Sequence, residues 1–183
     1  MRKFYLGFIL LLLTPLASMA EESFLSWLLS VERKNEVAPI NNELYAEECG
    51  ACHFAYPPGL LPEASWKKVI AATALADHFG DNAELDNESR QSIEQFLIRH
   101  SADKSYYKRS LKIMAALKSD EAPMRITELR FYKNKHQELK DKHVKNNQKV
   151  KSFSYCDKCH RLAEQAIFDD DTVKIPEFGH WTW

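Results

Sequence analysis

The sequence predicts an all-α fold, on two observations. No segment alternates apolar and polar residues with the period of two that is typical of a half-buried strand. The chain has only five glycines, and several segments combine a helix-capping residue with apolar side chains at helical spacing. A chain of 183 residues is long enough for one domain or for two small lobes with a shared core.

The N-terminal residues 1–20 are predicted to be a secretory signal peptide. Residues 2–3 are basic, an apolar run follows over residues 4–13, and residues 18–20 suit cleavage. The alternative is an uncleaved N-terminal anchor, although the apolar run is short for a bilayer span. We therefore expect export to the periplasm, with a mature chain that begins at Glu21.

The formal net charge is close to zero. It is −1 at pH 7 for the whole chain, and loss of the basic signal peptide would make the mature chain slightly more acidic. A nucleic-acid-binding domain would normally need a basic face, so the charge argues against a nucleic-acid partner. The lysine-rich stretch 133–151 could dock an acidic partner. Glu138 and Asp141 interrupt it, however, and we interpret it as a solvated helical face.

Residues 21–42 are predicted to be an N-terminal extension, and their secondary structure is ambiguous. Asn41 and Asn42 can cap a short helix over Glu43–Glu48. This helix would deliver Cys49 to its place in the fold.

A proline-rich loop is predicted over residues 54–62. Its three prolines exclude both helix and sheet ladder, and its apolar residues indicate that something large covers it. Ser65 then suits the N-cap of a helix that runs to about His78, and Gly80 suits its end. Asp86 can start the next helix. The apolar stripe of that helix consists of Ile93, Phe96, Leu97 and His100.

Three further helices are predicted in the C-terminal half. The first carries a stripe of Tyr107, Leu111, Met114 and Lys118. The second runs from about Thr127 to His143, and one of its faces is formed by Leu129, Tyr132, His136, Leu139 and His143. The third is expected over Cys156–Gln165, before an acidic turn at Asp169–Asp171 and an irregular tail.

Two segments carry the same motif, C-x-x-C-H, at Cys49–His53 and Cys156–His160. This motif attaches c-type haem. Its spacing presents two thiols to the vinyl groups along one haem edge, and the imidazole of the next residue reaches the iron as the proximal ligand. The expected attachment residues are Cys49, Cys52, Cys156 and Cys159, and the expected proximal iron ligands are His53 and His160. The sequence therefore predicts two covalently bound haem c groups.

Paired cysteines also occur in disulfides and in zinc sites. Four cysteines in an exported chain would suggest two disulfides, and two C-x-x-C pairs can hold a tetrahedral zinc ion. Here 103 positions separate His53 from Cys156, which is far more than in a zinc ribbon. Neither alternative explains a histidine directly after each pair, so we favour haem.

The second axial ligand of each iron decides what the haem can do. An iron closed by His or Met as its sixth ligand transfers electrons. An open, five-coordinate iron instead binds gases or performs chemistry. Beyond the signal peptide the only methionines are Met114 and Met124. Five histidines lie outside the motifs: His78, His100, His136, His143 and His180. This supply favours bis-histidine coordination, which gives a low reduction potential compared with His/Met.

The positions of these histidines rank them as ligands. His136 lies within an apolar helix face, where a buried imidazole needs a partner such as iron. His78 lies at a helix end, where it either reaches inward at a bend or interacts with the helix dipole. We interpret His100 as a cap of its helix C-terminus and His143 as a solvated helix-end residue. His180 lies in the tail and ranks last.

Several segments together resemble the periplasmic di-haem cytochrome c family. They are Glu48–Pro58 with the first motif, Leu60-Leu61-Pro62, Ser65-Trp66, His78-Phe79-Gly80, Arg125-Ile126-Thr127, His136, the second motif and Ile175-Pro176. The likeness covers residues 45–179. Its apolar loop with a double proline is more specific than a bare C-x-x-C-H.

The resemblance implies a class I cytochrome c-like N-terminal haem lobe, expected over residues 43–104, and a helical C-terminal haem lobe, expected over residues 105–183. It also implies two low-potential bis-histidine haems. His78 matches the distal ligand expected for the first haem and His136 that for the second, while His100 matches no ligand of the family. The partners it implies are a membrane b-type cytochrome or a small oxygen-binding haem protein of the periplasm.

The leading functional hypothesis is a periplasmic electron carrier that turns over no small-molecule substrate. The alternative is a haem enzyme, such as a di-haem peroxidase or a small-molecule reductase, with one open or labile iron. The chain is short for such an enzyme, and it supplies enough histidines to close both irons.

Overall fold

The computed structural model describes residues 33–181. The predicted signal peptide and most of the predicted N-terminal extension lie outside the described residues. The chain divides into residues 1–33 and 34–183. The described part of the second unit contains the helices α2 (Glu43–Gly50), α3 (Glu63–Val69), α4 (Ala72–Ala76), α5 (Asn87–Arg99), α6 (Lys108–Ala116) and α7 (Arg130–Lys135), and the strands β1 (Lys174–Ile175) and β2 (Gly179–His180). The all-α prediction is confirmed apart from this short hairpin.

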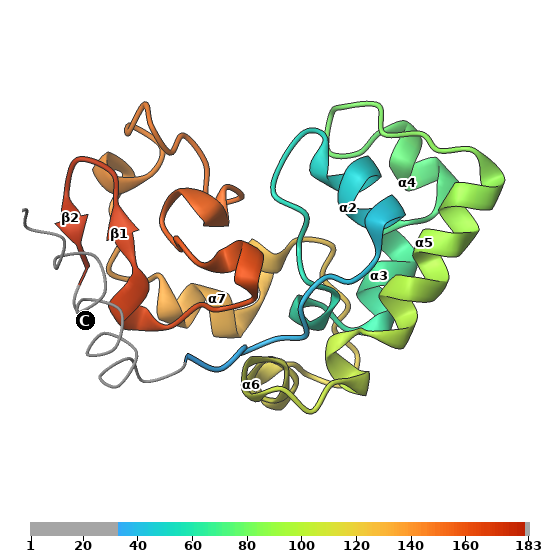
Figure 1. Cartoon of the computed structure of the whole chain (residues 1–183), viewed down its shortest axis with the longest axis horizontal. Helices are drawn as coiled ribbons and strands as arrows, with labels where there is room; N and C mark the ends of the chain where they lie inside the picture. The colour runs from blue at the N-terminus through green and yellow to red at the C-terminus, as the bar shows by residue number, and fades with distance from the viewer. Residues whose placement is uncertain (1–32, 182–183) are drawn as a thin grey trace, which may run out of the picture. The chain divides into compact units, whose positions relative to one another are not determined.

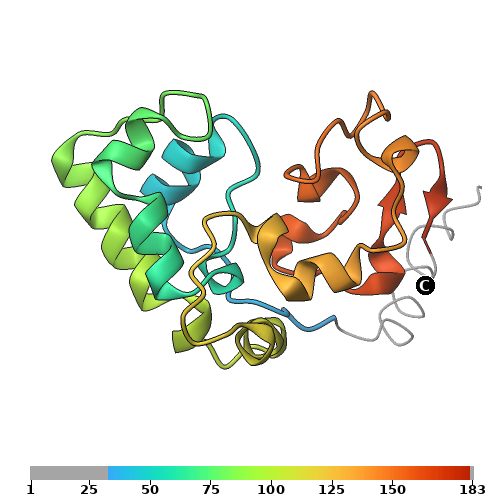
Figure 2. The ribbon, with the colours of Figure 1, turned by 180° about the vertical axis from the view of Figure 1, so that it is seen from behind.

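The helices form two groups (Figure 1, Figure 2). Helices α2, α3, α4 and α5 lie together, whereas α7 lies with the hairpin and with long irregular segments. Helix α6 packs against both α7 and the 3-10 turn Pro58–Leu60. One cluster of buried apolar residues extends from Tyr45 and Ile93 to Leu129 and Phe168. The two groups therefore share a core, while the lobe boundaries and the class I-like character of the first lobe stay predictions.

Two of the three N-caps predicted from the sequence are confirmed, whereas the third, Ser65, lies inside α3. The Asn42 side chain accepts a hydrogen bond of 2.8 Å from the backbone N–H of Tyr45, and the Asp86 carboxylate accepts from the N–H groups of Glu88 and Ser89. Capping depends on residues within three positions of each other, so it can be predicted from the local sequence. Helix α5 buries three residues of its predicted stripe: Ile93, Phe96 and Leu97.

The predicted single helix from Ser65 to His78 is wrong. The chain forms two short helices, and α3 begins directly after Pro62. Pro62 is the N-cap of α3 and is extended, at φ −73° and ψ 162°, and at a helix start its missing N–H costs no helical hydrogen bond. Ala71, at φ −59° and ψ 138°, is extended and separates α3 from α4. His78 therefore lies in a turn beyond α4 rather than on a helix.

The predicted apolar stripe of α6 is also wrong. In α6 the side chain of Leu111 is 54% exposed, whereas Ser110 and Ile113 are buried. The Ser110 hydroxyl donates a hydrogen bond of 2.8 Å to the carbonyl of Gly59. A Cβ atom at Gly59 would lie 2.7 Å from that hydroxyl oxygen, so only glycine permits this contact. The long-range contact with the proline-rich loop decides which face of α6 is buried.

The predicted helix from Thr127 to His143 is much shorter in the structure. Helix α7 spans Arg130–Lys135 and is capped by His136, at φ −114° and ψ 10°. The chain then leaves the helical path and re-enters a 3-10 turn at Asp141–His143. His143 is buried there, so tertiary burial overrides the helical periodicity of this segment.

The predicted helix over Cys156–Gln165 is wrong. Two separate 3-10 turns, Cys156–Lys158 and Ala163–Gln165, replace it. The N–H of Lys174 donates to the carbonyl of Cys159 at 3.0 Å, and His160 pairs with Val173 as an isolated bridge. Backbone groups that a helix would use internally thus bond to a later segment. The tail is not irregular throughout, because β1 and β2 pair there in antiparallel register.

No helix in the described part of the chain is long and apolar enough to span a bilayer.

Candidate haem-binding sites

The first motif opens onto a cavity of about 1370 Å³, including its mouth. Helix α2 delivers Cys49, and Cys52 and His53 follow in the turn beyond it. The cavity is lined mostly by apolar side chains. Its apolar walls include Leu61, Trp66, Val69, Ile70, Leu75, Leu85 and Leu97. The walls thus come from α3, α4, α5 and the proline-rich loop, which accounts for the apolar character of that loop.

His78 faces His53 across this cavity. Their ring centroids are 6.4 Å apart and their planes lie at 18°. A tight turn holds His78, whose N–H donates to the carbonyl of Asp81 at 2.7 Å. Within this turn Phe79 has φ 59° and Gly80 has φ 108°, a left-handed conformation that suits glycine and is costly for phenylalanine. The turn beyond α4 therefore places this imidazole.

The second motif opens onto a separate cavity of about 860 Å³. Cys156, Cys159 and His160 lie on its irregular C-terminal wall. Its other lining residues are mostly apolar and include Leu60, Ile113, Leu129, Leu139, Val144, Val150, Val173 and Ile175. Both cavities are lined in part by Ile126, Phe153 and Cys156. The two sites are therefore neighbours that share a wall.

His136 faces His160 across the second cavity, with ring centroids 6.1 Å apart and planes at 68°. His136 is placed by its position at the end of α7. Its ring stacks on Tyr132 one turn earlier, at 3.9 Å between centroids and 17° between planes. The inward direction expected for His136 is thus what the structure shows, although the helix that carries it is short.

The spacing of each histidine pair fits one metal ion held between two imidazoles. A metal–imidazole bond is about 2 Å long and the ring centre lies about 1 Å beyond the nitrogen, so two axial imidazoles place their centroids about 6 Å apart. The observed separations are 6.4 Å for His53 and His78 and 6.1 Å for His136 and His160. The residues present therefore fit two six-coordinate haem irons.

Hydrogen bonds prepare two of the imidazoles for this role. Nδ1 of His53 bonds to the carbonyl of Phe54 at 2.8 Å, and Nδ1 of His136 bonds to the carbonyl of Tyr132 at 2.9 Å. A carbonyl only accepts, so each Nδ1 carries the proton and each Nε2 keeps a lone pair for a metal.

Burial favours the neutral form of three of the facing imidazoles, those of His78, His136 and His160. It lowers the pKa of His160 to about 3, with smaller contributions from His136 and Arg109. Burial is also the main cause that lowers the pKa of His136, and that of His78. A neutral imidazole is the form that binds a metal, so the sites favour ligand chemistry over a protonated histidine.

The disulfide and zinc alternatives find no support in the described residues. All four cysteines are free. Burial raises the pKa of Cys49 and Cys159 to about 11 and that of Cys156 to about 12, which disfavours the thiolates that zinc requires. Within residues 33–181, no three His, Cys, Asp or Glu side chains converge on a point that could hold a metal ion.

The remaining histidines lie outside both cavities. His100 caps the C-terminal end of α5, as expected, and His180 lies exposed on β2. His143 was expected to be a solvated helix-end residue, and this is wrong. Its side chain is only 5% exposed and contacts the rings of Phe178 and Trp181 at centroid distances of 4.8 and 5.0 Å. The C-terminal hairpin covers it, which the helical pattern could not reveal.

Sequence reasoning missed three residues of these sites. Tyr132 was assigned to a helix face, but not as a stacking partner of His136. Phe153 lines both cavities and carries no motif. Arg109 lines the second cavity, and no local pattern distinguishes it from the other basic residues of α6. Of these three residues, only Tyr132 could have been identified from the sequence, because its i, i+4 spacing to His136 places the two side chains side by side on a helix.

Two C-x-x-C-H segments, each with a second histidine facing it across an apolar cavity, define the class of c-type cytochromes with two haem sites. The chain matches the family model described as dihaem cytochrome c over residues 45–168, and it belongs to this family. Membership makes the chain an electron-transfer haem protein with two covalently bound haem c groups.

Solved structures agree with this assignment. The chain is similar to a dihaem cytochrome c of Shewanella baltica, with 43% identity and a TM-score of 0.64 over 77% of this chain and 98% of that one. It is also similar to a dihaem cytochrome c of Rhodobacter sphaeroides, with 38% identity and a TM-score of 0.62 over 71% of this chain and 98% of that one. No curated protein matched the chain in a sequence search.

Proposed function

We propose that the protein is a periplasmic electron carrier with two bis-histidine haems of low reduction potential. The observation that carries this proposal is the pairing of His53 with His78 and of His136 with His160 across two apolar cavities. In this proposal the covalent attachment residues are Cys49, Cys52, Cys156 and Cys159, the proximal iron ligands are His53 and His160, and the distal ligands are His78 and His136. A bound haem supplies an iron that alternates between Fe(III) and Fe(II) and so carries one electron.

The chain's own residues suit electron transfer better than catalysis. With two imidazoles as its axial ligands, each iron would have no coordination site free for a substrate. The carbonyls of Phe54 and Tyr132 fix the tautomers of His53 and His136, so the ligands need little rearrangement when the charge on the iron changes. The haem-enzyme alternative would need one of these imidazoles to be displaced.

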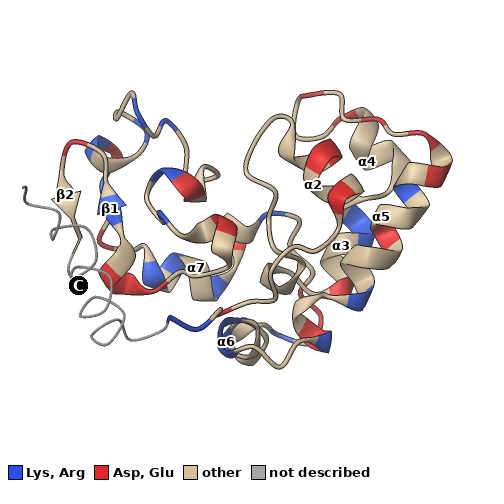
Figure 3. Cartoon of the chain, viewed as in Figure 1, with Lys and Arg blue, Asp and Glu red and all other residues tan. Residues whose placement is uncertain are grey.

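Opposite charges on the two halves support distinct docking faces for redox partners. Residues 43–104 hold 11 acidic and 5 basic residues, whereas residues 105–183 hold 11 acidic and 16 basic residues. Figure 3 shows acidic residues on α2 and around the 77–88 turn. Glu48 and Asp81 line the first cavity itself. A partner with a basic face is therefore directed to the first haem, and one with an acidic face to the second.

The proposed partners are a membrane b-type cytochrome and a small oxygen-binding haem protein. Docking of a basic partner at the first haem site is tested with a basic c-type cytochrome as the electron acceptor. We expect a rate of electron transfer that falls as salt rises, and that falls again in Glu48→Lys and Asp81→Lys. The control, Lys142→Glu, should not slow the reaction. A rate that is insensitive to salt and to the acidic variants would rule out docking at the first site.

Spectroscopy of the reduced protein tests the electron-carrier proposal directly. The protein is isolated from the periplasm of a host with haem-maturation machinery, reduced and exposed to carbon monoxide. Two closed irons should give a low-spin spectrum that carbon monoxide does not change. A carbon monoxide complex of one haem in the unmodified protein would favour the enzyme alternative.

A further inference from the structure

Arg109 is a buried cation beside the second haem site. Its side chain extends from α6 and is 14% exposed. The guanidinium donates a hydrogen bond of 2.9 Å to the carbonyl of Phe168 and forms an ion pair with the carboxylate of Glu36. The backbone repeats this connection, because Arg109 N–H donates to the carbonyl of Glu36 at 3.0 Å. The guanidinium is thus held in one place.

The ring of Phe168 separates this cation from the proximal histidine. The guanidinium carbon of Arg109 lies 5.3 Å from the centroid of the Phe168 ring, and that ring lies 5.4 Å from the ring of His160. Phe168 is buried, so a low-dielectric group fills the space between cation and ligand. A charge in such surroundings is poorly screened by salt and acts over a longer distance than at the surface.

The ion pair is oriented with its positive end toward the haem. Arg109 lines the second haem cavity, together with His136 and His160. It also lines a neighbouring polar cleft, and Glu36 lies in that cleft rather than in the haem cavity. The partner carboxylate therefore weakens the field of Arg109 at the site without cancelling it.

We propose that Arg109 is an electrostatic positioning residue of the second haem site, and that its charge raises the reduction potential of the haem held by His160. Reduction adds one electron to the iron from an external donor and moves no proton on Arg109. A fixed cation nearby stabilises the more electron-rich Fe(II) state relative to Fe(III). Glu36 opposes the effect. The inference rests on the proposed function, because it takes His160 as an iron ligand.

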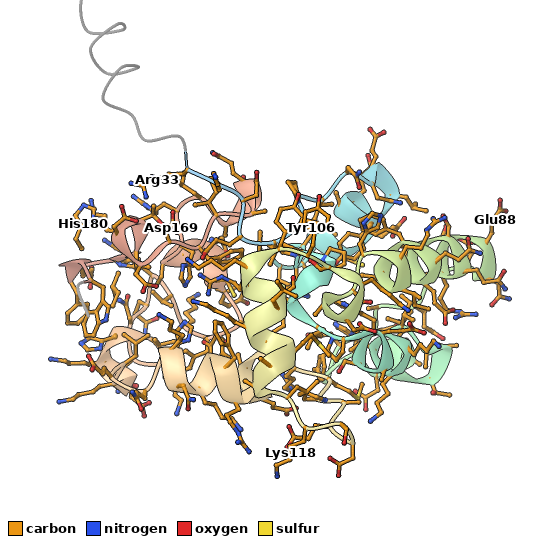
Figure 4. The ribbon with its side chains drawn as sticks, turned by 90° about the horizontal axis from the view of Figure 1, so that it is seen from below. Arg33, Glu88, Tyr106, Lys118, Asp169 and His180 are labelled. Atoms are coloured by element: carbon orange, nitrogen blue, oxygen red, sulfur yellow. The ribbon has the colours of Figure 1, made fainter. Side chains whose placement is uncertain are left out.

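Charge variants of the holoprotein test the proposal. Arg109→Gln should lower the midpoint potential of the second haem, and Glu36→Gln should raise it, while the first haem keeps its potential in both. Arg109→Lys keeps the charge and should restore most of the potential. Matched controls are Lys118→Gln and Glu88→Gln, whose side chains project at the edges of the molecule (Figure 4). Both controls should leave both potentials unchanged.

The readout is a redox titration followed by electron paramagnetic resonance, which distinguishes the haems by the different angles of their imidazole pairs. Opposite shifts in Arg109→Gln and Glu36→Gln support an electrostatic role. Shifts in the same direction, no shift, or a shift of the first haem would overturn it, because loss of a merely structural ion pair affects both variants alike. If Arg109→Gln does not fold, the potentials of Glu36→Gln and Arg109→Lys test the electrostatic role instead. Failure of the proposed function is seen separately, as an unmodified protein without two low-spin haems.

Discussion

The imidazole rings of His53 and His78 lie almost parallel, at 18° to each other. The corresponding rings of His136 and His160 cross at 68°. The plane of an axial imidazole determines which iron d orbital it raises in energy by π donation. Parallel planes raise one orbital of the pair, whereas perpendicular planes raise both and leave them almost degenerate. The two proposed haem sites should therefore differ electronically, although each would use two histidines.

This difference predicts two distinct low-spin signals in the electron paramagnetic resonance spectrum of the oxidised protein. The first site should give a rhombic signal, because its orbitals are well separated. The second site should give a highly anisotropic signal with a large g value. A double variant, Cys49→Ala/Cys52→Ala, assigns the signals by removing the first. Two identical rhombic signals would contradict the geometry of the second pair.

Replacement of His136 should open the second iron alone. In His136→Ala we expect one high-spin haem that binds carbon monoxide, with the first haem unchanged. The control is His143→Ala, because His143 is also buried but lies outside both cavities. This control should keep its low-spin spectrum and lose about 1–3 kcal/mol of stability as its contacts with Phe178 and Trp181 disappear. The reverse pattern of spectra would exclude His136 as the ligand.

Covalent attachment predicts a definite mass. Two haems should add about 1.2 kDa to the mature chain. Cys156→Ala removes one thioether at the second site only, so its intact-mass and pyridine haemochrome spectra should show altered attachment there and an intact first site. Native periplasmic protein without covalently bound haem would falsify the assignment of both motifs.

The close approach of Gly59 to Ser110 predicts a packing cost. Gly59→Ala places a Cβ atom 2.7 Å from the Ser110 hydroxyl oxygen, and we expect it to destabilise the protein by about 1–3 kcal/mol in chemical denaturation. A second change, Ser110→Gly, should recover part of this loss. The matched control is Gly50→Ala, where the nearest atom to a new Cβ lies 3.8 Å away. Equal effects at both glycines would refute the contact.

Haem-free protein should be poorly folded. The two cavities, of about 1370 and 860 Å³, lie where core side chains such as Leu61 and Leu129 converge. Without a bound group these side chains lose their packing partner, so cofactor binding and folding are linked. We expect reduced helicity and no sharp thermal transition when the chain is produced without haem-maturation machinery. A fully helical apoprotein that melts cooperatively would argue that the core forms without haem.

Features that depend on neighbours along the chain could be predicted from the sequence. The side chains of Asn42 and Asp86 cap helices within three residues of themselves, so the starts of α2 and α5 could be predicted. The spacing within each C-x-x-C-H motif likewise follows from local geometry. His136 could be expected to face inward because Tyr132 lies one turn before it.

Features that depend on contacts between distant segments could not be predicted from the sequence. The buried face of α6 is set by Ser110 and Gly59, 51 positions apart. Arg109 becomes part of the second site through Glu36, 73 positions away. His143 is buried because the C-terminal hairpin covers it. The segment after Cys156 forms turns rather than a helix, because its backbone bonds to a later segment. Helical periodicity records only which residues are apolar, whereas these outcomes depend on which surfaces meet once the chain has folded.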